Sequence, residues 1–262
     1  MFESSNIPFG ILIKNNLTGG TPMQRYQVIS QEELEKIHEN SLRIMEEVGI
    51  IITYEHARRT LEKHGCRLDG KKVHFPRTLV EEAIRLSPSS YTLYGRDPSK
   101  NVTITCEDVA YAGPYGSPFV TDMDKGRREG SLEDFINIVK ICDKLPNIDI
   151  QSHISCEPQD VPVKERPVTM VYNTMKYSGK PLMGSVYGYE NAMHCIELAA
   201  IPFGGLDAIK EKPVISSIPC TLTPLSYDER QLGAIRAYAE TGQPQLVNSL
   251  SIAGMTTPAT LA

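Results

Sequence analysis

Lys180-Pro-Leu-Met-Gly-Ser185 is one of four similar stretches that decide the fold. The others are Pro146-Asn-Ile-Asp-Ile150, Lys212-Pro-Val-Ile-Ser-Ser217 and Gln243-Pro-Gln-Leu-Val-Asn-Ser249, and the four prolines are spaced by 35, 32 and 31 residues. Each stretch leads into a predicted strand, and helical patterns follow the first three, at about 165–177, 190–200 and 228–240. Units of about 30 residues in the order strand, loop, helix are typical of a parallel sheet in an α/β fold.

The number of units predicts part of a larger architecture. A (β/α)8 barrel needs eight such units, and this sequence carries four. The last residues, Thr256-Thr-Pro-Ala-Thr-Leu-Ala262, resemble the start of a fourth helix. We therefore expect residues 131–262 to form the first half of a TIM barrel, truncated, and a complete four-stranded domain is the alternative.

Residues 1–130 predict a mixed region of helices and β-hairpins. Ser30 and Glu33 form a capping box before a helical apolar pattern that Gly49 ends. A second helix is expected at about 55–63, and Pro76 is placed as the first residue of a third. The segments 91–94 and 102–106 read as strands, and Asp124-Lys-Gly126 reads as a hairpin turn near a strand at Val120.

Composition limits the class of protein. The 262 residues are 40% hydrophobic and 23% charged, with a net charge of −5, which argues against a sequence-independent nucleic-acid binder. We read neither a signal peptide nor an apolar run of the ~18 residues that a membrane helix needs. The six cysteines lack C-x-x-C spacing, so we expect free thiols and a cytoplasmic protein. Only couples of metal-type ligands occur, at His153 with Cys156 and at His194 with Cys195, so no metal is predicted.

Candidate site residues follow from the carboxyl ends of the predicted strands, where parallel α/β folds place function. In the first strand Ile148 and Ile150 alternate with Asp149, Gln151 and His153, and the polar set is expected to face the barrel axis. In the second strand Met183, Ser185 and Tyr187 share a face. With the loop 111–119 added, the candidate substrate-binding residues are Tyr111, Tyr115, His153, Glu157, Ser185, Tyr187, Cys220 and Asn248.

Each candidate has a chemical interpretation and a plainer one. His153 with Glu157 could act as a base and its orienting partner, or His153 could be a buried, hydrogen-bonded core histidine. Tyr187, together with Tyr189 and the two loop tyrosines, could wall a cage for an alkylated ammonium, or be ordinary core and surface tyrosines. Cys220 could be a nucleophile, but no base is evident near it in the sequence.

Several motifs resemble a known family. Leu93-Tyr-Gly-Arg-Asp97 resembles a segment of the trimethylamine methyltransferase superfamily, as do Val139-Lys-Ile-Cys-Asp143 with Asn147-Ile-Asp149, and Pro219-Cys-Thr-Leu-Thr-Pro-Leu225. The final stretch, Leu250-Ser-Ile-Ala-Gly-Met-Thr-Thr-Pro-Ala-Thr-Leu-Ala262, is similar to the family's small-residue segment. The four motifs occur in the family's order.

The resemblance implies a TIM barrel that moves a methyl group from a methylated amine to the Co(I) of a corrinoid. The corrinoid is supplied by a cognate partner protein, and no cofactor is bound directly. Trimethylamine members carry pyrrolysine at a position that corresponds to a point beyond Ala262. Other members demethylate quaternary amines such as glycine betaine, and the loop Gly113-Pro-Tyr-Gly-Ser-Pro-Phe119 is more similar to theirs.

The open edges of half a barrel predict a homo-oligomer and no activity for these 262 residues alone. Two other functions stay open. One is a non-catalytic domain of the same ancestry that binds amines or a partner. The other is a metal-dependent barrel hydrolase that uses His153 and His194.

Overall fold

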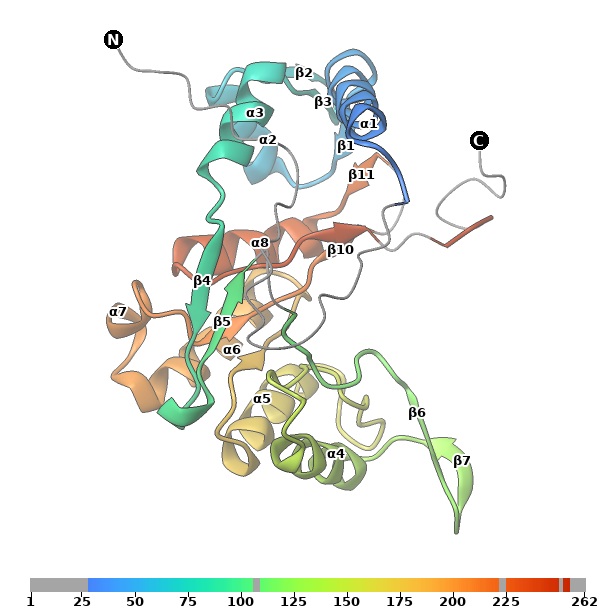
Figure 1. The fold of residues 1–262 in the computed structure, drawn as a ribbon, viewed down its shortest axis with the longest axis vertical. Coiled ribbons are helices and arrows are strands. Elements are labelled where there is room, and N and C mark those ends of the chain that lie inside the picture. The colour runs from blue at the N-terminus through green and yellow to red at the C-terminus, as the bar shows by residue number, and fades with distance from the viewer. Residues whose placement is uncertain (1–27, 106–108, 222–224, 250–251, 255–262) are drawn as a thin grey trace, which may run out of the picture.

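The computed structural model describes residues 28–105, 109–221, 225–249 and 252–254 (Figure 1). An N-terminal lobe lies at the top of Figure 1, above a larger body of helices and short strands. The lobe contains α1 (Gln31–Arg43), the π-helical turn η1 (Ile44–Val48), β1 (Ile50–Ile52), α2 (Glu55–Lys63), β2 (Arg67–Asp69), β3 (Lys72–His74) and α3 (Arg77–Leu86).

Local signals explain where these helices begin and end. The capping box is confirmed, because the Glu33 N–H donates to Ser30 Oγ and the Ser30 N–H donates to Glu33 Oε2. Gly49 ends the first helical segment with φ 77°, a conformation that favours glycine. The second helix has the predicted bounds, whereas Pro76 is the N-cap of α3, one residue before the place predicted for it.

The lobe contains a sheet that the sequence did not predict in detail. Its strand order is β11-β1-β3-β2, where β11 (Ser226–Tyr227) comes from the far end of the chain. Ile51 pairs with Ser226 in parallel, and β3 pairs antiparallel with both β1 and β2. Ile52, Cys66 and Val73 are the buried centre of the lobe's core.

Two hairpins follow, both at predicted positions. The first joins β4 (Ser90–Leu93) to β5 (Val102–Thr105), with the 3-10 turn η2 (Pro98–Lys100) between them. The second joins β6 (Phe119–Asp122) to β7 (Gly126–Glu129) and projects from the body (Figure 1). Arg128 secures its base through ion pairs with Asp122 and Asp134.

The four proline-led segments pair in parallel, as predicted. Single bridges join Gln151 to Leu182 and Ser217 to Gln245. The remaining pairs join β8 to β9 and β10 to β12, again in parallel. The bounds of these strands are Leu182–Met183 for β8, Ile215–Ser216 for β9, Cys220–Thr221 for β10 and Asn248–Ser249 for β12.

The helices between these segments also agree with the sequence pattern. α4 (Leu132–Lys144) precedes the first segment, and α5 (Arg166–Tyr177), α6 (Tyr189–Ala200) and α8 (Glu229–Glu240) lie between successive segments. After α6 come the short η3 (Ile201–Phe203) and α7 (Leu206–Ile209). The described residues form small sheets and no closed barrel, so the half barrel stays a prediction, as does the division at residue 130. Among these residues no helix is both long and apolar enough to cross a bilayer.

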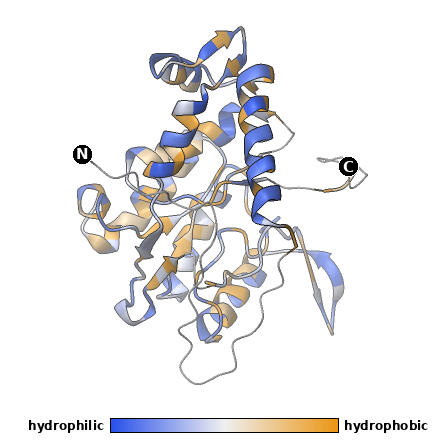
Figure 2. Ribbon diagram, turned by 45° about the horizontal axis from the view of Figure 1, so that its top comes forward, coloured by the Kyte–Doolittle hydropathy of each residue, from blue (hydrophilic) through white to orange (hydrophobic). Residues whose placement is uncertain are grey.

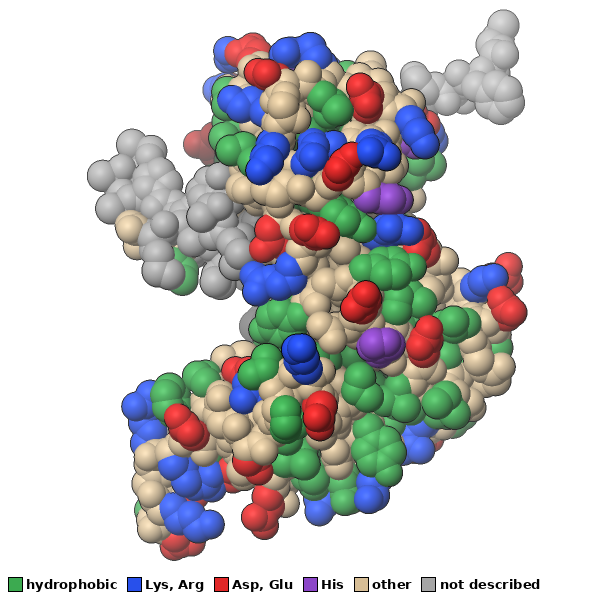
Figure 3. Space-filling view, turned by 180° about the vertical axis from the view of Figure 1, so that it is seen from behind, with side chains coloured by type: hydrophobic (Ala, Val, Ile, Leu, Met, Phe, Trp, Pro, Cys, Tyr) green, Lys and Arg blue, Asp and Glu red, His purple; other side chains and the backbone are tan. Residues whose placement is uncertain are grey.

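The parallel segments are covered on both faces. Leu182 and Ile215 pack in the largest core cluster, against α6 and α8. Ile150 and Met183 pack on the other side, against Leu93 of the β4–β5 hairpin. Figure 2 shows apolar residues gathered in the body, while the long α1 is mostly hydrophilic. Seen from behind, the body also presents most of the exposed hydrophobic surface, and charges of both signs cover the lobe (Figure 3).

The sequence predicted which side chains of each strand face the barrel axis and which face the helices. That assignment is right for the second strand and wrong for the first. Met183 lies on the Leu93 face, as expected. Ile150 shares that face, whereas Gln151 donates to the Val139 carbonyl of α4 and to Ser178 Oγ. A glutamine on the helix side satisfies backbone and hydroxyl groups there, so polarity in this strand does not mark the inner face.

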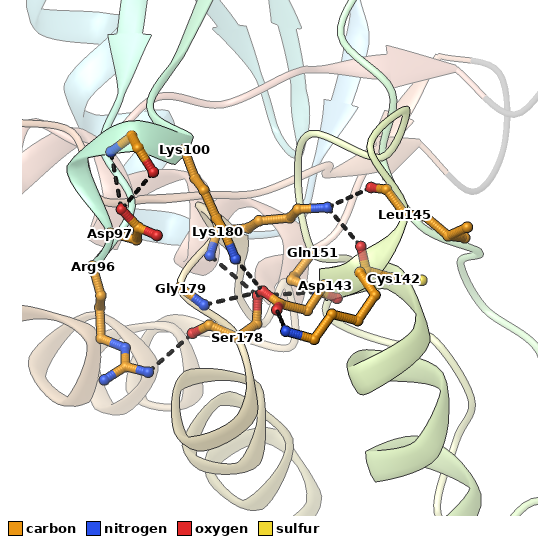
Figure 4. A network of polar contacts seen from close by, with 12 residues as sticks. Arg96, Asp97, Lys100, Cys142, Asp143, Leu145, Gln151, Ser178, Gly179 and Lys180 are labelled. Atoms are coloured by element: carbon orange, nitrogen blue, oxygen red, sulfur yellow. Dashed lines mark hydrogen bonds and ion pairs between the residues drawn. The ribbon is translucent and has the colours of Figure 1, made fainter.

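A polar network secures the amino ends of the segments (Figure 4). Lys180 is 7% exposed, and its Nζ donates to the carbonyls of Cys142 (2.6 Å) and Leu145 (2.8 Å) at the end of α4. Asp143 accepts hydrogen bonds from Lys100 Nζ, Ser178 Oγ and the Gly179 N–H. Burial raises the pKa of Asp143, but these hydrogen bonds outweigh burial and hold the pKa at about 2.

Candidate functional site

The loop that follows β5 lies beside the first parallel segment. The Gly113 N–H donates to the Ile150 carbonyl, and the Gly116 N–H donates to the Ile154 carbonyl at 2.8 Å. Ser152 Oγ donates back to the Gly113 carbonyl at 2.6 Å. These bonds hold Tyr115, between the two glycines, at the carboxyl edge of the parallel segments.

Four of the eight predicted residues come together at this edge. Cys220 Sγ donates to Asn248 Oδ1 at 2.7 Å, across the β10–β12 pair. Burial raises the pKa of Tyr115, and the neighbouring Tyr187 and Cys220 groups raise it further. Burial also raises the pKa of the Cys220 thiol. We call Tyr115, Tyr187, Cys220 and Asn248 the edge cluster.

The edge cluster is uncharged, because two phenols, a thiol and an amide make it up. The raised pKa values of Tyr115 and Cys220 keep both groups protonated at neutral pH. Tyr115 is 41% exposed and Tyr187 43%, so both offer aromatic surface to a ligand. Aromatic faces attract alkylated ammonium groups without a formal negative charge.

Charged groups lie next to the cluster rather than inside it. The Arg230 guanidinium carbon lies 5.5 Å from the centre of the Tyr187 ring. Tyr187 and Arg230 also line a groove of about 530 Å³ between the beginnings of α6 and α8, which Tyr54 of the N-terminal lobe borders. Gly188 also lines this groove. It is the N-cap of α6 and has φ 90°, a conformation that favours glycine. The groove therefore connects Tyr187 to side chains of both charges, since Glu190, Glu229 and Arg236 line it as well as Arg230.

Ser185 and His153 are buried, with different consequences. Ser185 is fully buried, and its Oγ accepts a hydrogen bond from the Tyr187 N–H. This bond fixes the backbone at Tyr187. His153 is 1% exposed, and neither ring nitrogen has a hydrogen-bond partner. Burial lowers the pKa of His153 to about 3, so the imidazole is neutral.

The remaining candidates do not make the contacts that the sequence suggested. Glu157 forms an ion pair with Arg166 at 2.7 Å, and it does not orient His153. Tyr111 is 58% exposed, and its backbone N–H donates to Asp149 Oδ2. Tyr189 donates its hydroxyl to Glu240 and already has the Arg236 guanidinium 4.7 Å from its ring centre. Arg236 therefore lies closer to the Tyr189 ring than Arg230 lies to the Tyr187 ring.

Sequence reasoning missed two residues beside the cluster. Gln231 Nε2 donates to the Cys220 carbonyl, and its Oε1 is buried without a partner. Arg230 stands over Tyr187. Both lie in the first turn of α8, which Asp228 caps through the Gln231 N–H. In the sequence, Asp228 indicates only that a helix begins there. The fold, and no local pattern, brings the start of α8 next to Cys220 at the end of the third segment.

In the part of the chain that the structure describes, no group of side chains is suited to hold a metal ion. No three side chains of the histidine, cysteine, aspartate or glutamate type gather there. The five cysteines described, Cys66, Cys142, Cys156, Cys195 and Cys220, are free thiols as predicted, and Cys106 lies outside the described residues. The hydrolase alternative therefore finds no ligand set among these residues.

Comparisons with known proteins agree with the resemblance in the motifs. The family described as trimethylamine methyltransferase (MTTB) matches residues 14–262. A glycine betaine methyltransferase of Desulfitobacterium hafniense strain Y51 is 41% identical over 93% of this chain and 51% of its own length.

Two more distant relatives have related names. The trimethylamine methyltransferase MttB of D. hafniense strain DSM 10664 / DCB-2 is 29% identical over 89% of this chain and 47% of its own length. A proline betaine:corrinoid methyltransferase of Eubacterium limosum is 26% identical over 89% of this chain and 49% of its own length. The chain spans about half the length of the curated relatives it matches. On this evidence, the chain belongs to the trimethylamine methyltransferase family.

Proposed function

We propose that the protein transfers a methyl group from a quaternary amine of the betaine type to a corrinoid carried by a partner protein. Family membership and the names of the relatives support methyl transfer from methylated amines. Two of those names include a betaine substrate, and one includes a corrinoid acceptor. The proposal concerns the whole protein, of which these residues contribute one side of the site.

The observation that carries the proposal is the uncharged edge cluster. A quaternary nitrogen loses its positive charge as the C–N bond breaks, and the electron pair stays on nitrogen. A buried carboxylate would stabilise the cationic substrate more than the transition state and would slow the reaction. The faces of Tyr115 and Tyr187 bind the cation more weakly, so less stabilisation is lost as the charge disappears.

The neighbouring Arg230 supports a betaine over trimethylamine. A betaine has a carboxylate a few bonds from its quaternary nitrogen, whereas trimethylamine has none. The Arg230 side chain is 46% exposed, and its ion pair with Asp228 is long at 3.5 Å, so the guanidinium is available to a carboxylate. Tyr187 and Arg230 would then bind the two ends of the zwitterion, which fixes the orientation of its methyl groups.

The corrinoid supplies a Co(I) nucleophile, and the residues of this chain bind and align the methyl donor. Tyr115 and Tyr187 hold the ammonium, and Asn248 holds the Cys220 thiol in a fixed position beside them. The thiol is not proposed as a nucleophile, because burial keeps it protonated. No proton transfer is required of His153.

The test uses the full-length protein with its reduced corrinoid partner. Methylation of the corrinoid is followed by its absorbance, with glycine betaine and trimethylamine supplied separately. We expect transfer from the betaine, a loss of at least tenfold in kcat/KM for Tyr187→Leu, and near-normal activity for Tyr187→Phe. Betaine binding without transfer would support the non-catalytic alternative instead, and equal activity of Tyr187→Leu would remove the edge cluster from the site.

A further inference from the structure

One face of the first helical segment is apolar and exposed. Leu34, Ile37, Ser41, Ile44 and Val48 are spaced by 3, 4, 3 and 4 residues along α1 and η1. This spacing is the heptad pattern of a helix that packs along another helix. Ile37 is 56% exposed, Ile44 42% and Val48 46%. We call these five residues the α1 seam.

The rest of α1 is fixed to the lobe from a different side. Leu42 is 2% exposed and is the buried residue of this helix. Arg77 of α3 forms an ion pair with Glu39. The helix is therefore held through Leu42 and Glu39, while Ile37, Ile44 and Val48 of the seam stay exposed. Three large aliphatic side chains in one exposed row are more than scattered surface residues require.

The seam is complementary to itself. When a second copy of α1 lies antiparallel with Ser41 at the centre, Leu34 faces Val48 of that copy. In the same arrangement Ile37 lies opposite Met45 and next to Ile44 of that copy, and the two Ser41 residues meet at the two-fold axis. A small residue at the centre lets the helix axes approach closely. An interface in which the same patch serves both subunits is the isologous contact of a two-fold dimer.

Charges beside the seam fit the same arrangement. Lys36 and Glu47 lie on one flank of the seam, five residues before and six residues after Ser41. The antiparallel copy therefore places Lys36 of each subunit near Glu47 of the other. At present Lys36 pairs with Glu32 and Glu47 pairs with Arg43, with Lys36 67% and Glu47 62% exposed. Exposed pairs of this kind contribute little, so exchanging partners costs little.

We propose that the α1 seam binds the α1 seam of a second copy of this chain as an antiparallel helix pair. The seam is 15 residues long, from Leu34 to Val48. Its α-helical part, residues 34–43, extends about 15 Å at 1.5 Å per residue, and the π-helical turn η1 adds about one more turn, so the contact is short for a stable interface. We therefore expect a reversible dimer that dissociates in the micromolar range. This contact is independent of the edge cluster and of the methyl-transfer proposal.

Cysteine cross-linking tests the register directly. In the full-length protein, Ser41→Cys places two thiols at the two-fold axis, so mild oxidation should produce a disulfide-linked dimer. Glu32→Cys is the matched control, because Glu32 is 77% exposed on the same helix but lies on the opposite face. The unsubstituted protein gives the background from native thiols. We expect at least tenfold more dimer for Ser41→Cys than for either control.

Two further variants separate the contact from folding. Ile37→Lys should shift sedimentation equilibrium to the monomer with an unchanged circular dichroism spectrum, because Ile37 is already exposed. Lys36→Glu and Glu47→Lys should each weaken the dimer, and the double variant should restore it because both pairs are then reversed. A monomer at 100 µM, or a dimer that Ile37→Lys leaves intact, would overturn the proposal. So would equal cross-linking of Ser41→Cys and Glu32→Cys, which would indicate that another segment covers the seam.

Discussion

A Cβ atom on Gly184 would lie 2.5 Å from the hydroxyl oxygen of Tyr238. The same atom would lie 2.6 Å from Ile215 Cδ1. Tyr238 is fully buried in α8, and its hydroxyl has no hydrogen-bond partner. The residue after β8 must therefore lack a side chain, because α8 packs directly on the backbone there.

Gly184→Ala should lower the free energy of unfolding by about 1–3 kcal/mol, the usual cost of overpacking a core. Urea unfolding of purified protein measures it. Tyr238→Phe removes one of the two clashing atoms, so the cost of Gly184→Ala should be smaller in that background. An equal cost in both backgrounds would show that the tyrosine hydroxyl does not limit the space.

Lys180→Met should lower the free energy of unfolding by about 2–3 kcal/mol, because it leaves the buried Cys142 carbonyl and the part-buried Leu145 carbonyl at the end of α4 without a charged donor. Lys144→Met is the control. Lys144 is 87% exposed and lies 3.7 Å from Asp143, so its loss should cost under about 0.5 kcal/mol. Similar costs for the two variants would contradict the assignment of Lys180 as a buried cap.

Asp143 should make stability depend on pH in the acid range. Its folded pKa of about 2 is below that of the unfolded chain, so its contribution is present above about pH 4 and is lost as pH falls toward 2. The contribution is about 2 kcal/mol from the size of that shift. Unfolding measured at intervals from pH 5 to pH 2.5 should fall less steeply for Asp143→Asn than for the unsubstituted protein. Parallel curves would show that Asp143 has an ordinary pKa.

His153 should make stability depend on pH in a higher range than Asp143 does. Its folded pKa is lowered to about 3, so the unfolded chain takes up the proton first as pH falls below about 6.5. Stability is full above that pH and falls by up to about 1.4 kcal/mol for each unit below it. His153→Phe should remove this slope between pH 6.5 and pH 5, whatever its own effect at pH 7. An unchanged slope would place the imidazole in contact with water.

Arg230→Met should raise KM for glycine betaine about tenfold or more, because a charged hydrogen bond to the substrate carboxylate is lost. Any activity with trimethylamine should be unaffected. Arg236→Met is the matched control, since Arg236 stacks on Tyr189 in the same groove but is held by Glu240 and Tyr54. Equal effects of the two substitutions would indicate a general change in the groove rather than recognition of a carboxylate.

Local signals predicted much of the helical structure and the parallel pairing of the proline-led segments. Ser30 with Glu33 marks a helix start that the structure confirms as a capping box. The proline-led segments predicted parallel pairing because their spacing leaves room for one helix each. These features depend on residues close together in the chain, which a sequence pattern can express.

Contacts between residues far apart in the chain were harder to predict from the sequence. Polarity placed Gln151 on the wrong face, because its hydrogen bonds to Val139 and Ser178 come from helix α4 and the end of α5. The residues of the edge cluster were predicted only as strand ends and as part of the loop 111–119, and Arg230 was absent from the prediction. Its place over Tyr187 depends on how α8 packs against α6, which no local motif encodes.

The pairing of Ile51 with Ser226 has a consequence for how the protein is made. The two residues are 175 positions apart, so β1 leaves the ribosome long before its parallel neighbour exists. At 5–20 residues per second the delay is roughly 9–35 s. During that time one edge of β1, with the sequence Ile50-Ile-Ile52, has no partner from this sheet and could pair with other chains. Synthesis should therefore pass through a period in which the nascent lobe depends on chaperones, and the arrival of Ser226 ends it.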